Sequence, residues 1–289
     1  MMILITGATG HLGSQVIEFL LEKKDPASIA ALVRDDSKAG DLIAKGVDVR
    51  VGNYEDKKSL EDAFEGIETL LLVSGNDVER RQQQHFNAIN AAKKAGVQYV
   101  IYTSFDRKKE EGSPLGILAQ GHINTDNHLK ESGLDYTILR NTLYADALPM
   151  FLGGEVLEAG IFFPAGDGKV PFVTRRELAE ATARILLTDG HKNKAYVLAN
   201  TRSYSMHDIA LMLSDIAGRE VVYHNPPREI YVDQLVKASV PQPMIDAGAV
   251  FGDAIKTGEF ETDHTDLPEL LGREPLPLKD YLKALYTPV

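Results

Sequence analysis

A chain of 289 residues with 44% hydrophobic residues is long enough to bury one large core, or two of unequal size. Its net charge of −11 argues against nonspecific binding to nucleic acid, and the absence of cysteine excludes disulfides, thiolate metal sites and a thiol nucleophile. With no secretory leader and no apolar run of about 18 residues, we expect a globular cytoplasmic protein that does not enter the membrane.

The first thirteen residues predict a buried strand, a tight turn and the start of a helix. The apolar run 2–5 leads into Gly7, Gly10 and Gly13, and apolar residues with helical spacing follow. In this context such glycines let backbone N–H groups approach a pyrophosphate, and the helix N-terminus adds partial positive charge. The motif therefore predicts a dinucleotide site, with a plain strand–helix turn as the alternative.

Strand and helix patterns then alternate through the first two hundred residues. Short apolar runs predict further strands at 29–33, 47–51, 69–73, 99–102, 135–139 and 196–198. Helical spacing predicts helices at 42–44, 59–64, 80–95, 118–132 and 176–187. Continuous apolar strands separated by helices indicate a doubly wound parallel sheet, the α/β fold of the NAD(P)-binding Rossmann type.

Ligands of such a sheet bind beyond the carboxyl ends of its strands. Five predicted strand ends fall on one edge of the sheet. They are Thr6-Gly7, Arg34, Asn53-Tyr54, Ser74-Gly75 and Thr103-Ser104.

Glycine and proline interrupt the alternating pattern from about residue 145 onward. We therefore predict a dinucleotide-binding domain at 1–145 with about 169–200, and a smaller lobe at 146–168 and 201–289. Within that lobe, Ser205 is the expected N-cap of a helix to 217, and a short strand is expected at 220–223. The charged run 107–111 is expected to be solvated surface, with a phosphate or substrate clamp as the alternative.

The residue that ends the second strand bears on the choice of dinucleotide. A carboxylate at that place would bind a ribose 2′-hydroxyl, whereas this chain has Arg34, which suits a 2′-phosphate. We therefore expect NADP(H) to be preferred over NAD(H). Asp35 and Asp36 stand nearby and would weaken that preference.

Several motifs together resemble one family. The stretch 6–13 is similar to the opening of the atypical short-chain dehydrogenase/reductase superfamily. Stretches 32–34, 52–54, 73–75, 89–97, 102–104, 136–141, 173–179 and 270–273 narrow the resemblance to the NmrA-like group. Within it, the nearest branch is that of NAD(P)H:quinone oxidoreductase type 2 and triphenylmethane reductase.

The resemblance implies an NADP(H) site along the strand ends and a substrate cleft between two lobes. By position, the residues implied to bind NADP are Gly7, Thr9, Gly10, His11, Leu12, Gly13 and Arg34. Those implied to line the cofactor toward its nicotinamide are Ser74, Gly75, Thr103 and Ser104. Asn53 falls near the adenine, where relatives often carry an acidic residue. Asn141 and Tyr144 match a stretch beside the substrate cleft.

Most short-chain dehydrogenases use a Tyr-x-x-x-Lys pair for proton transfer. The literal match, Tyr54 and Lys58, follows the third strand on the adenine side, so we reject it. At the family's tyrosine and lysine places stand Ile123 and Asn127, neither of which can do that chemistry. Dehydrogenation of alcohols and epimerisation of sugars thus become less favoured than hydride transfer to a quinone or a cationic dye, which needs little acid–base help.

Three side chains remain tentative catalytic candidates. His122 either touches substrate or is a surface histidine, Tyr144 either hydrogen-bonds the acceptor or only packs, and Asn141 holds substrate, cofactor or backbone. No metal site is expected, even where Asp263, His264 and Asp266 lie close together.

The leading hypothesis is thus NADPH-dependent reduction of a quinone-like or other electrophilic small molecule. The alternatives are a noncatalytic NADP-binding redox sensor that acts through a protein partner and, more weakly, a nucleotide-sugar epimerase-like protein. No helix shows a pattern that fixes the oligomeric state.

Overall fold

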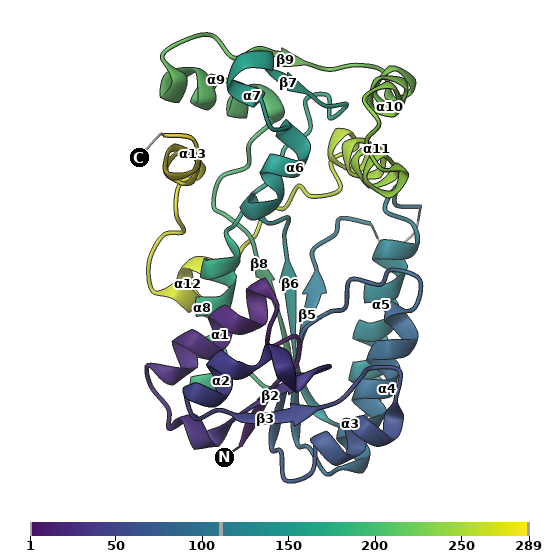
Figure 1. The fold of residues 1–289 in the computed structure, drawn as a ribbon, viewed down its shortest axis with the longest axis vertical. Helices are drawn as coiled ribbons and strands as arrows, with labels where there is room; N and C mark the ends of the chain where they lie inside the picture. The colour runs from purple at the N-terminus through teal and green to yellow at the C-terminus, as the bar shows by residue number, and fades with distance from the viewer. Residues whose placement is uncertain (1, 110–111, 288–289) are drawn as a thin grey trace.

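The computed structural model describes residues 2–109 and 112–287. Its centre is a seven-stranded parallel sheet in the order β3-β2-β1-β4-β5-β6-β8 (Figure 1). The strands are β1 (Ile3–Ile5), β2 (Ile29–Val33), β3 (Asp48–Val51), β4 (Thr69–Leu72), β5 (Tyr99–Phe105), β6 (Asp135–Asn141) and β8 (Lys194–Leu198). The order reverses direction between β1 and β4, which is the switch point where doubly wound sheets bind dinucleotides. The predicted fold class is confirmed.

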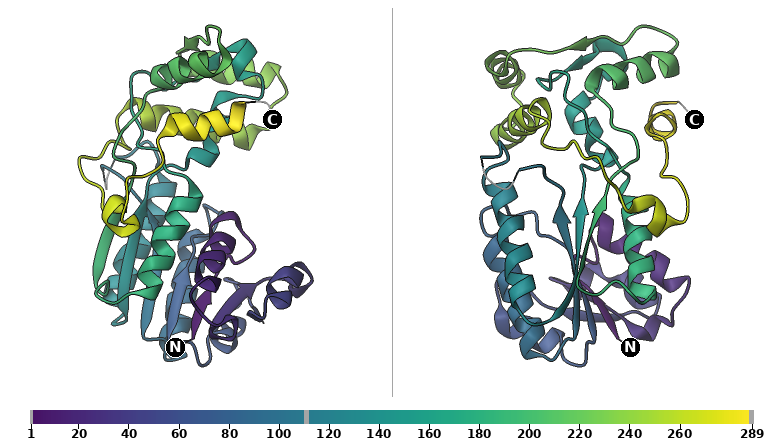
Figure 2. Two further views of the ribbon diagram at one scale, coloured as in Figure 1. Left: turned by 90° about the vertical axis from the view of Figure 1, so that its left-hand side faces the viewer. Right: turned by 180° about the vertical axis from the view of Figure 1, so that it is seen from behind.

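Helices cover both faces of the sheet (Figure 2). Packed on one face are α1 (His11–Leu21), α8 (Arg175–Leu187) and α12 (Leu267–Leu271), and on the other α3 (Lys57–Ala63), α4 (Arg81–Lys94) and α5 (Ile117–Glu131). Strand β1 shows why: Ile3 and Ile5 enter the first core and Leu4 the second, as the twofold alternation of a strand requires. A short helix, α2 (Gly40–Ala44), leads into β3.

Strands β5 and β6 extend beyond their predicted ends. Strand β5 continues to Phe105 and β6 to Asn141, with Ser104 opposite Arg140 in the register. The apolar pattern stops earlier because four of these last residues are polar, namely Thr103, Ser104, Arg140 and Asn141. Their backbones nevertheless pair with each other, so the ladder runs on and holds these polar side chains inside the sheet rather than at its edge.

A second body of structure stands above the carboxyl edge of the sheet (Figure 1). It contains β7 (Ile161–Phe162) and β9 (Tyr223–His224), which pair in parallel, and helices α6 (Leu148–Leu152), α7 (Val156–Ala159), α9 (Met206–Ala217), α10 (Arg228–Lys237), α11 (Gln242–Lys256) and α13 (Leu278–Tyr286). Ser205 caps α9 as predicted, in a capping box with Asp208. The predicted strand at 220–223 overlaps β9 only at Tyr223.

The core of this upper body also takes in residues from outside the predicted lobe, among them Leu115, Leu143 and Phe172. The two parts of the chain are thus joined by shared packing. The division into a domain at 1–145 with 169–200 and a smaller lobe at 146–168 and 201–289 stays a prediction.

The end of the chain passes from the upper body to the sheet and back again. After α11, residues Thr265 and Asp266 hydrogen-bond the backbone of β8, and α12 then packs on α8. Helix α13 returns to pack on α9 in the upper body. These contacts cover the outer edge of β8, which would otherwise present unpaired backbone groups.

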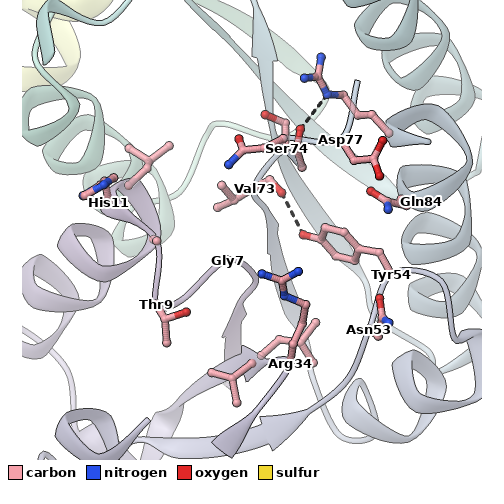
Figure 3. A pocket seen from close by; sticks show the side chains of 18 of the residues that line it. Gly7, Thr9, His11, Arg34, Asn53, Tyr54, Val73, Ser74, Asp77 and Gln84 are labelled. Carbon is pink, nitrogen blue, oxygen red and sulfur yellow. Dashed lines mark hydrogen bonds between the residues drawn. The ribbon is translucent and has the colours of Figure 1, made fainter. Parts of the chain in front are cut away.

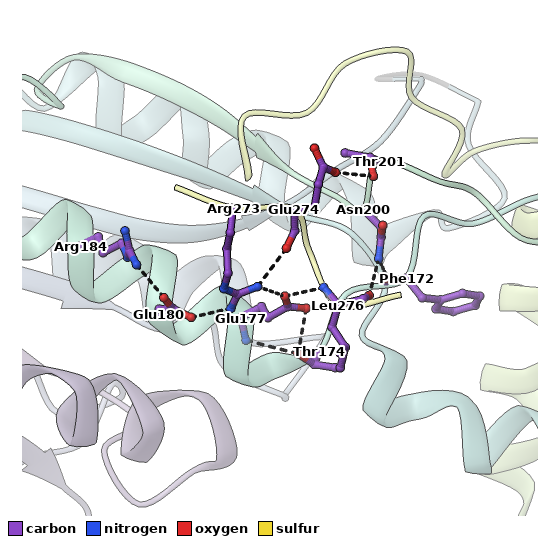
Figure 4. A network of polar contacts seen from close by, with 10 residues as sticks. All are labelled: Phe172, Thr174, Glu177, Glu180, Arg184, Asn200, Thr201, Arg273, Glu274 and Leu276. Atoms are coloured by element: carbon purple, nitrogen blue, oxygen red, sulfur yellow. Dashed lines mark hydrogen bonds and ion pairs between the residues drawn. The ribbon is translucent and has the colours of Figure 1, made fainter. Parts of the chain in front are cut away.

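A buried glutamate fastens this returning segment to the sheet domain (Figure 4). The Glu177 carboxylate on α8 forms an ion pair of 2.8 Å with Arg273 and accepts a hydrogen bond of 2.7 Å from the Leu276 N–H. Thr174 caps the same helix turn through its side chain. A single carboxylate therefore holds two separate groups of the C-terminal segment.

We expect Glu177→Gln to lower the free energy of unfolding by about 2 kcal/mol, because the neutral amide can still accept hydrogen bonds but carries no charge to pair with the Arg273 guanidinium. Urea denaturation measures this loss. Glu274→Gln is the matched control: Glu274 is exposed, and its carboxylate accepts a hydrogen bond from the Thr201 hydroxyl. Equal losses in the two variants would contradict the assignment.

Candidate functional site

The glycine turn between β1 and α1 depends on close backbone approach. Gly7 has φ of +58°, which favours glycine, and its carbonyl oxygen accepts a hydrogen bond of 2.9 Å from the Gly10 N–H. A Cβ added at Gly13 would lie 2.4 Å from that same oxygen. The first turn of α1 therefore sits directly on the loop, and only glycine at position 13 permits it.

The N-terminus of α1 is open toward a ligand. Its N-cap, Gly10, has no side chain to accept a hydrogen bond. Within the described residues, no group accepts from the N–H groups of His11, Leu12 or Gly13. Three free N–H groups and the helix dipole at one point form a site for an anion such as a pyrophosphate.

A pocket of about 670 Å³ extends from this turn along the carboxyl ends of β2, β3 and β4 (Figure 3). Most of the predicted site residues line it: Gly7, Thr9, Gly10, His11, Leu12, Gly13, Arg34, Asn53, Ser74, Gly75 and Tyr144. The residues of the wall that were not predicted as site residues include Tyr54, Asp77, Arg80, Arg81, Gln84 and Arg175. This lining includes no residue of 146–168 or 201–289, so the substrate cleft between lobes stays a prediction.

Arg34 directly follows β2, is exposed and faces the pocket. The neighbouring Asp35 is engaged elsewhere, because its carboxylate accepts a hydrogen bond of 3.0 Å from the Ser37 N–H. That hydrogen bonding lowers the pKa of Asp35. Among residues 2–109 and 112–287, no carboxylate pairs with Arg34. The guanidinium is thus available for a ligand phosphate.

Thr103, Ser104 and Asn141 lie deeper than their predicted roles require. Because β5 and β6 run on, all three side chains are buried in the sheet and are not part of the pocket wall. Thr103 instead accepts a hydrogen bond of 2.9 Å from the Ser74 N–H. It therefore fixes the backbone of a residue that does line the pocket, and direct contact of these three with a ligand stays a prediction.

Tyr54 and Lys58 do not form a catalytic pair. The Tyr54 hydroxyl lies 2.5 Å from Thr6 Oγ1 and 2.9 Å from the Val73 carbonyl oxygen, and burial raises its pKa. Lys58 is exposed and pairs with Asp62. At the family's dyad places on α5, Ile123 is buried and Asn127 exposed.

Two buried polar side chains of α4 hold Gly75 from both sides. Arg81 Nε donates to the Gly75 carbonyl oxygen over 2.8 Å, and His85 Nε2 accepts from the Gly75 N–H over 3.1 Å. The apolar pattern of α4 predicts Phe86 on the inner face, but Phe86 is only half-buried, and Arg81 and His85 are buried instead. Arg81 and His85 are four residues apart and so lie on one helix face, next to a strand end. This spacing is the feature of the sequence that could have indicated their role.

His122 lies behind Arg81 and outside the pocket wall. Its Nε2 is 3.1 Å from Arg81 Nη1, and its Nδ1 is 2.7 Å from the Tyr102 hydroxyl. Because arginine can only donate, Nε2 must accept, which places the imidazole proton on Nδ1. Burial, with the charge of Arg81, lowers the pKa of His122 well below its usual value. It is a neutral buried histidine rather than a surface one, and its contact with substrate stays a prediction.

The two buried histidines make stability depend on pH. Burial lowers the pKa of His85 to about 3, and that of His122 falls as well. The unfolded chain binds protons near pH 6.5 while the folded chain does not, so stability is complete above that pH and falls as the pH drops below it. We expect the free energy of unfolding at pH 5 to be about 2 kcal/mol lower for each histidine than at neutral pH.

Urea denaturation at the two pH values measures this difference. In His85→Gln about half of the pH dependence should disappear, since one of the two titrating groups is gone. A wild-type stability that does not change between pH 7 and pH 5 would refute the prediction.

Tyr144 forms the pocket wall on the side of β6. It pairs with Val173 in an isolated bridge, and the Arg175 guanidinium lies 4.6 Å from the centre of its ring. Burial raises the pKa of Tyr144, so the phenol stays protonated near neutral pH. Tyr144, Arg81 and Arg175 thus bring one hydroxyl and two cations to the pocket wall.

The charged run 107–111 is only partly solvated surface, which corrects the expectation. Arg107 forms an ion pair of 3.0 Å with Asp126, and the two side chains are 3% and 1% exposed. Lys108 and Lys109 are about half exposed, and Glu110 and Glu111 lie outside the described residues. The arginine is buried because α5 offers it a buried carboxylate that the local sequence does not reveal.

The chain as a whole resembles known reductases. Residues 1–282 match the sequence model of the NmrA-like family. The chain is 37% identical to quinone oxidoreductase 2 of Escherichia coli (strain K12) over 286 residues, which is 99% of each chain. It is 31% identical to the NAD(P)H azoreductase of Xenophilus azovorans, covering 98% of this chain and 97% of the relative.

A solved structure is also similar to this chain over nearly its whole length. The triphenylmethane reductase of Citrobacter sp., complexed with NADP(H), superposes with a TM-score of 0.92 at 36% identity, covering 98% of this chain and 99% of the other. In the part of the chain that the structure describes, no helix has the length and apolar character needed to cross a membrane.

Proposed function

Because the chain belongs to the NmrA-like family, we propose that it is an NADPH-dependent reductase that transfers hydride to a quinone-like or other electrophilic small molecule. One observation of the structure carries this proposal. A pocket built for a dinucleotide runs along the strand ends, and the places of the usual proton relay hold Ile123 and Asn127.

The residues of the pocket fit NADP(H). The free N–H groups at the start of α1 suit the pyrophosphate. Gly7 and Gly13 lie in close contact and carry no side chains, so none projects from these two positions toward the ligand. Arg34 and Asn53 both line the pocket, where Arg34 would bind the 2′-phosphate and Asn53 would lie near the adenine. When bound, NADPH supplies a hydride from C4 of its nicotinamide.

Ser74, Gly75 and Tyr144 would surround the nicotinamide end. Thr103 fixes the Ser74 backbone, while Arg81 and His85 fix Gly75, so this wall is rigid before any ligand arrives. Rigid placement is what hydride transfer needs, because the donor and acceptor atoms must be held close and aligned. The oxygens of a reduced quinone can take protons from water afterwards.

The proposal accounts for the absent dyad better than the alternatives that need acid–base chemistry. An alcohol dehydrogenase or a sugar epimerase must move a proton on the substrate oxygen, and Ile123 cannot do this. We also propose a cytoplasmic location, where such a reaction draws on NADPH. The acceptor is a small molecule, and a protein partner would be required only by a sensor.

One experiment tests the proposal against its rivals. The protein is mixed with NADPH and a panel of quinones, azo dyes and triphenylmethane dyes, and the loss of nicotinamide absorbance is followed. Turnover of at least one class supports a reductase. Tight NADPH binding without any turnover would instead favour the noncatalytic sensor, and conversion of a nucleotide sugar would favour the epimerase.

A further inference from the structure

Arg81 is a buried cation without an anionic partner among the described residues. It is 7% exposed, and its two recorded side-chain contacts are with neutral groups, the Gly75 carbonyl oxygen and His122 Nε2. The nearby carboxylate of Asp77 is occupied by Arg80, at 2.6 Å. In residues 2–109 and 112–287, nothing accepts a hydrogen bond from Arg81 Nη2.

No carboxylate of the described residues forms an ion pair with Arg81, although the charge of Asp77, which pairs with Arg80, acts on it from nearby. The hydroxyls of Tyr102 and Tyr144 are near enough to interact with it, but burial raises the pKa of both, so they remain neutral. A desolvated guanidinium without a counter-charge is costly, and a ligand oxygen that carries negative charge would relieve that cost. Arg81 lines the pocket, so such an oxygen can reach it there.

The orientation of Arg81 is fixed by its other contacts. Nε is held by Gly75, and Nη1 by His122, whose tautomer is set in turn by Tyr102. These two contacts fix the plane of the guanidinium and leave Nη2 without a protein acceptor among the described residues. A donor fixed in advance stabilises a developing charge without reorganising during the reaction.

Resting on the proposed function, we propose that Arg81 binds the oxygen of the acceptor and stabilises the negative charge that hydride transfer places on it. The site would then favour carbonyl acceptors such as quinones over cationic acceptors. In the reaction, the C–H bond at nicotinamide C4 breaks, and its hydrogen is transferred to the quinone as a hydride, together with both electrons of that bond. NADPH is oxidised to NADP⁺, the quinone is reduced to the hydroquinone monoanion, and that anion takes its proton from water.

The charge of the acceptor provides the test. A neutral naphthoquinone develops negative charge on oxygen during reduction, whereas a cationic triphenylmethane dye becomes neutral and develops none. We expect Arg81→Met to lower kcat/KM for the quinone by about 30-fold more than for the dye, the effect of one lost charge-assisted hydrogen bond, because the lost contact with Gly75 affects both acceptors alike. Arg81→Lys, which restores the charge, should recover part of the loss. Arg184→Met, on exposed α8 surface, is the control.

A second measurement does not depend on turnover. A phenolate such as para-nitrophenolate imitates the hydroquinone monoanion, and its visible absorbance reports binding to the NADP⁺ complex. We expect Arg81→Met to weaken phenolate binding by about tenfold more than it weakens NADPH binding, since only the phenolate would lose the charged partner. The phenolate titration also tests Arg81 if neither acceptor turns over, in which case the proposed function alone has failed.

Three results would overturn the inference. The first is an equal loss of quinone and dye reduction in Arg81→Met. The second is a loss of NADPH affinity that matches the loss of activity, which would show that Arg81 binds an oxygen of the cofactor. The third is phenolate binding that does not change in Arg81→Met. If the methionine variant does not fold, Arg81→Lys must still show a smaller but selective loss for the quinone.

Discussion

A Gly13→Ala variant is expected to lose measurable NADPH binding. The added Cβ would stand 2.4 Å from the Gly7 carbonyl oxygen, which is backbone and cannot turn aside. Either the loop or the start of α1 must then move, which would displace the free N–H groups of α1 that we propose for the pyrophosphate. The free energy of unfolding should also fall, by about 1–3 kcal/mol, as for other overpacked sites. Titration of cofactor fluorescence measures the binding, and urea denaturation measures the stability.

Two other glycines provide a graded control. At Gly10 the added Cβ would lie 3.1 Å from the same oxygen, so Gly10→Ala should weaken binding less. At Gly40, which begins α2, it meets nothing within 4 Å, and Gly40→Ala should leave binding unchanged. Wild-type NADPH binding by Gly13→Ala would show that the turn does not hold the pyrophosphate.

Arg34→Ala is expected to weaken NADPH binding by about 100-fold and NADH binding hardly at all, because only NADPH carries the 2′-phosphate. Arg34 is exposed and has no carboxylate partner in the described residues, so its loss should not disturb folding. The measurement is the ratio of the two dissociation constants in wild type and variant. Lys38→Ala, on the same loop but outside the pocket, is the control.

The outcome for Arg34 separates two interpretations of the pocket. A selective loss of NADPH affinity places the 2′-phosphate at the end of β2. Equal losses for NADPH and NADH would mean that Arg34 contacts something common to both, such as the adenine, and the preference for NADP(H) would need another source.

The parts of this protein that sequence predicts well are those governed by local rules. Gly7 and Gly13 are needed for a positive φ and a close backbone contact within one turn, so the motif shows in the residues themselves. The doubly wound parallel sheet likewise follows from apolar strands that alternate with helices. The position of Arg34 in the pocket wall follows from the end of β2, which the apolar run 29–33 already predicts.

The parts that sequence does not reveal depend on distant partners. Arg81 is buried because His122 accepts its hydrogen bond from 41 residues away, and Arg107 because Asp126 pairs with it from α5. Neither partner produces a periodic pattern in the sequence near the arginine that it contacts. Strands β7 and β9 have two residues each, too few for any alternation to be recognised. Arg81 was not predicted as a pocket residue because its partner His122 is distant in sequence, whereas β7 was not predicted, and β9 only at Tyr223, because both strands are so short.

The path of the last helices has a consequence for synthesis of the protein on the ribosome. Leu267 and Leu271 of α12 complete a core of the sheet, and Leu278 and Leu282 of α13 complete the core of the upper body. A nascent chain that has not yet reached these residues therefore keeps apolar surface uncovered in both places. Chains halted before α13 should depend on chaperones and be readily degraded, although the entire dinucleotide turn has already been made.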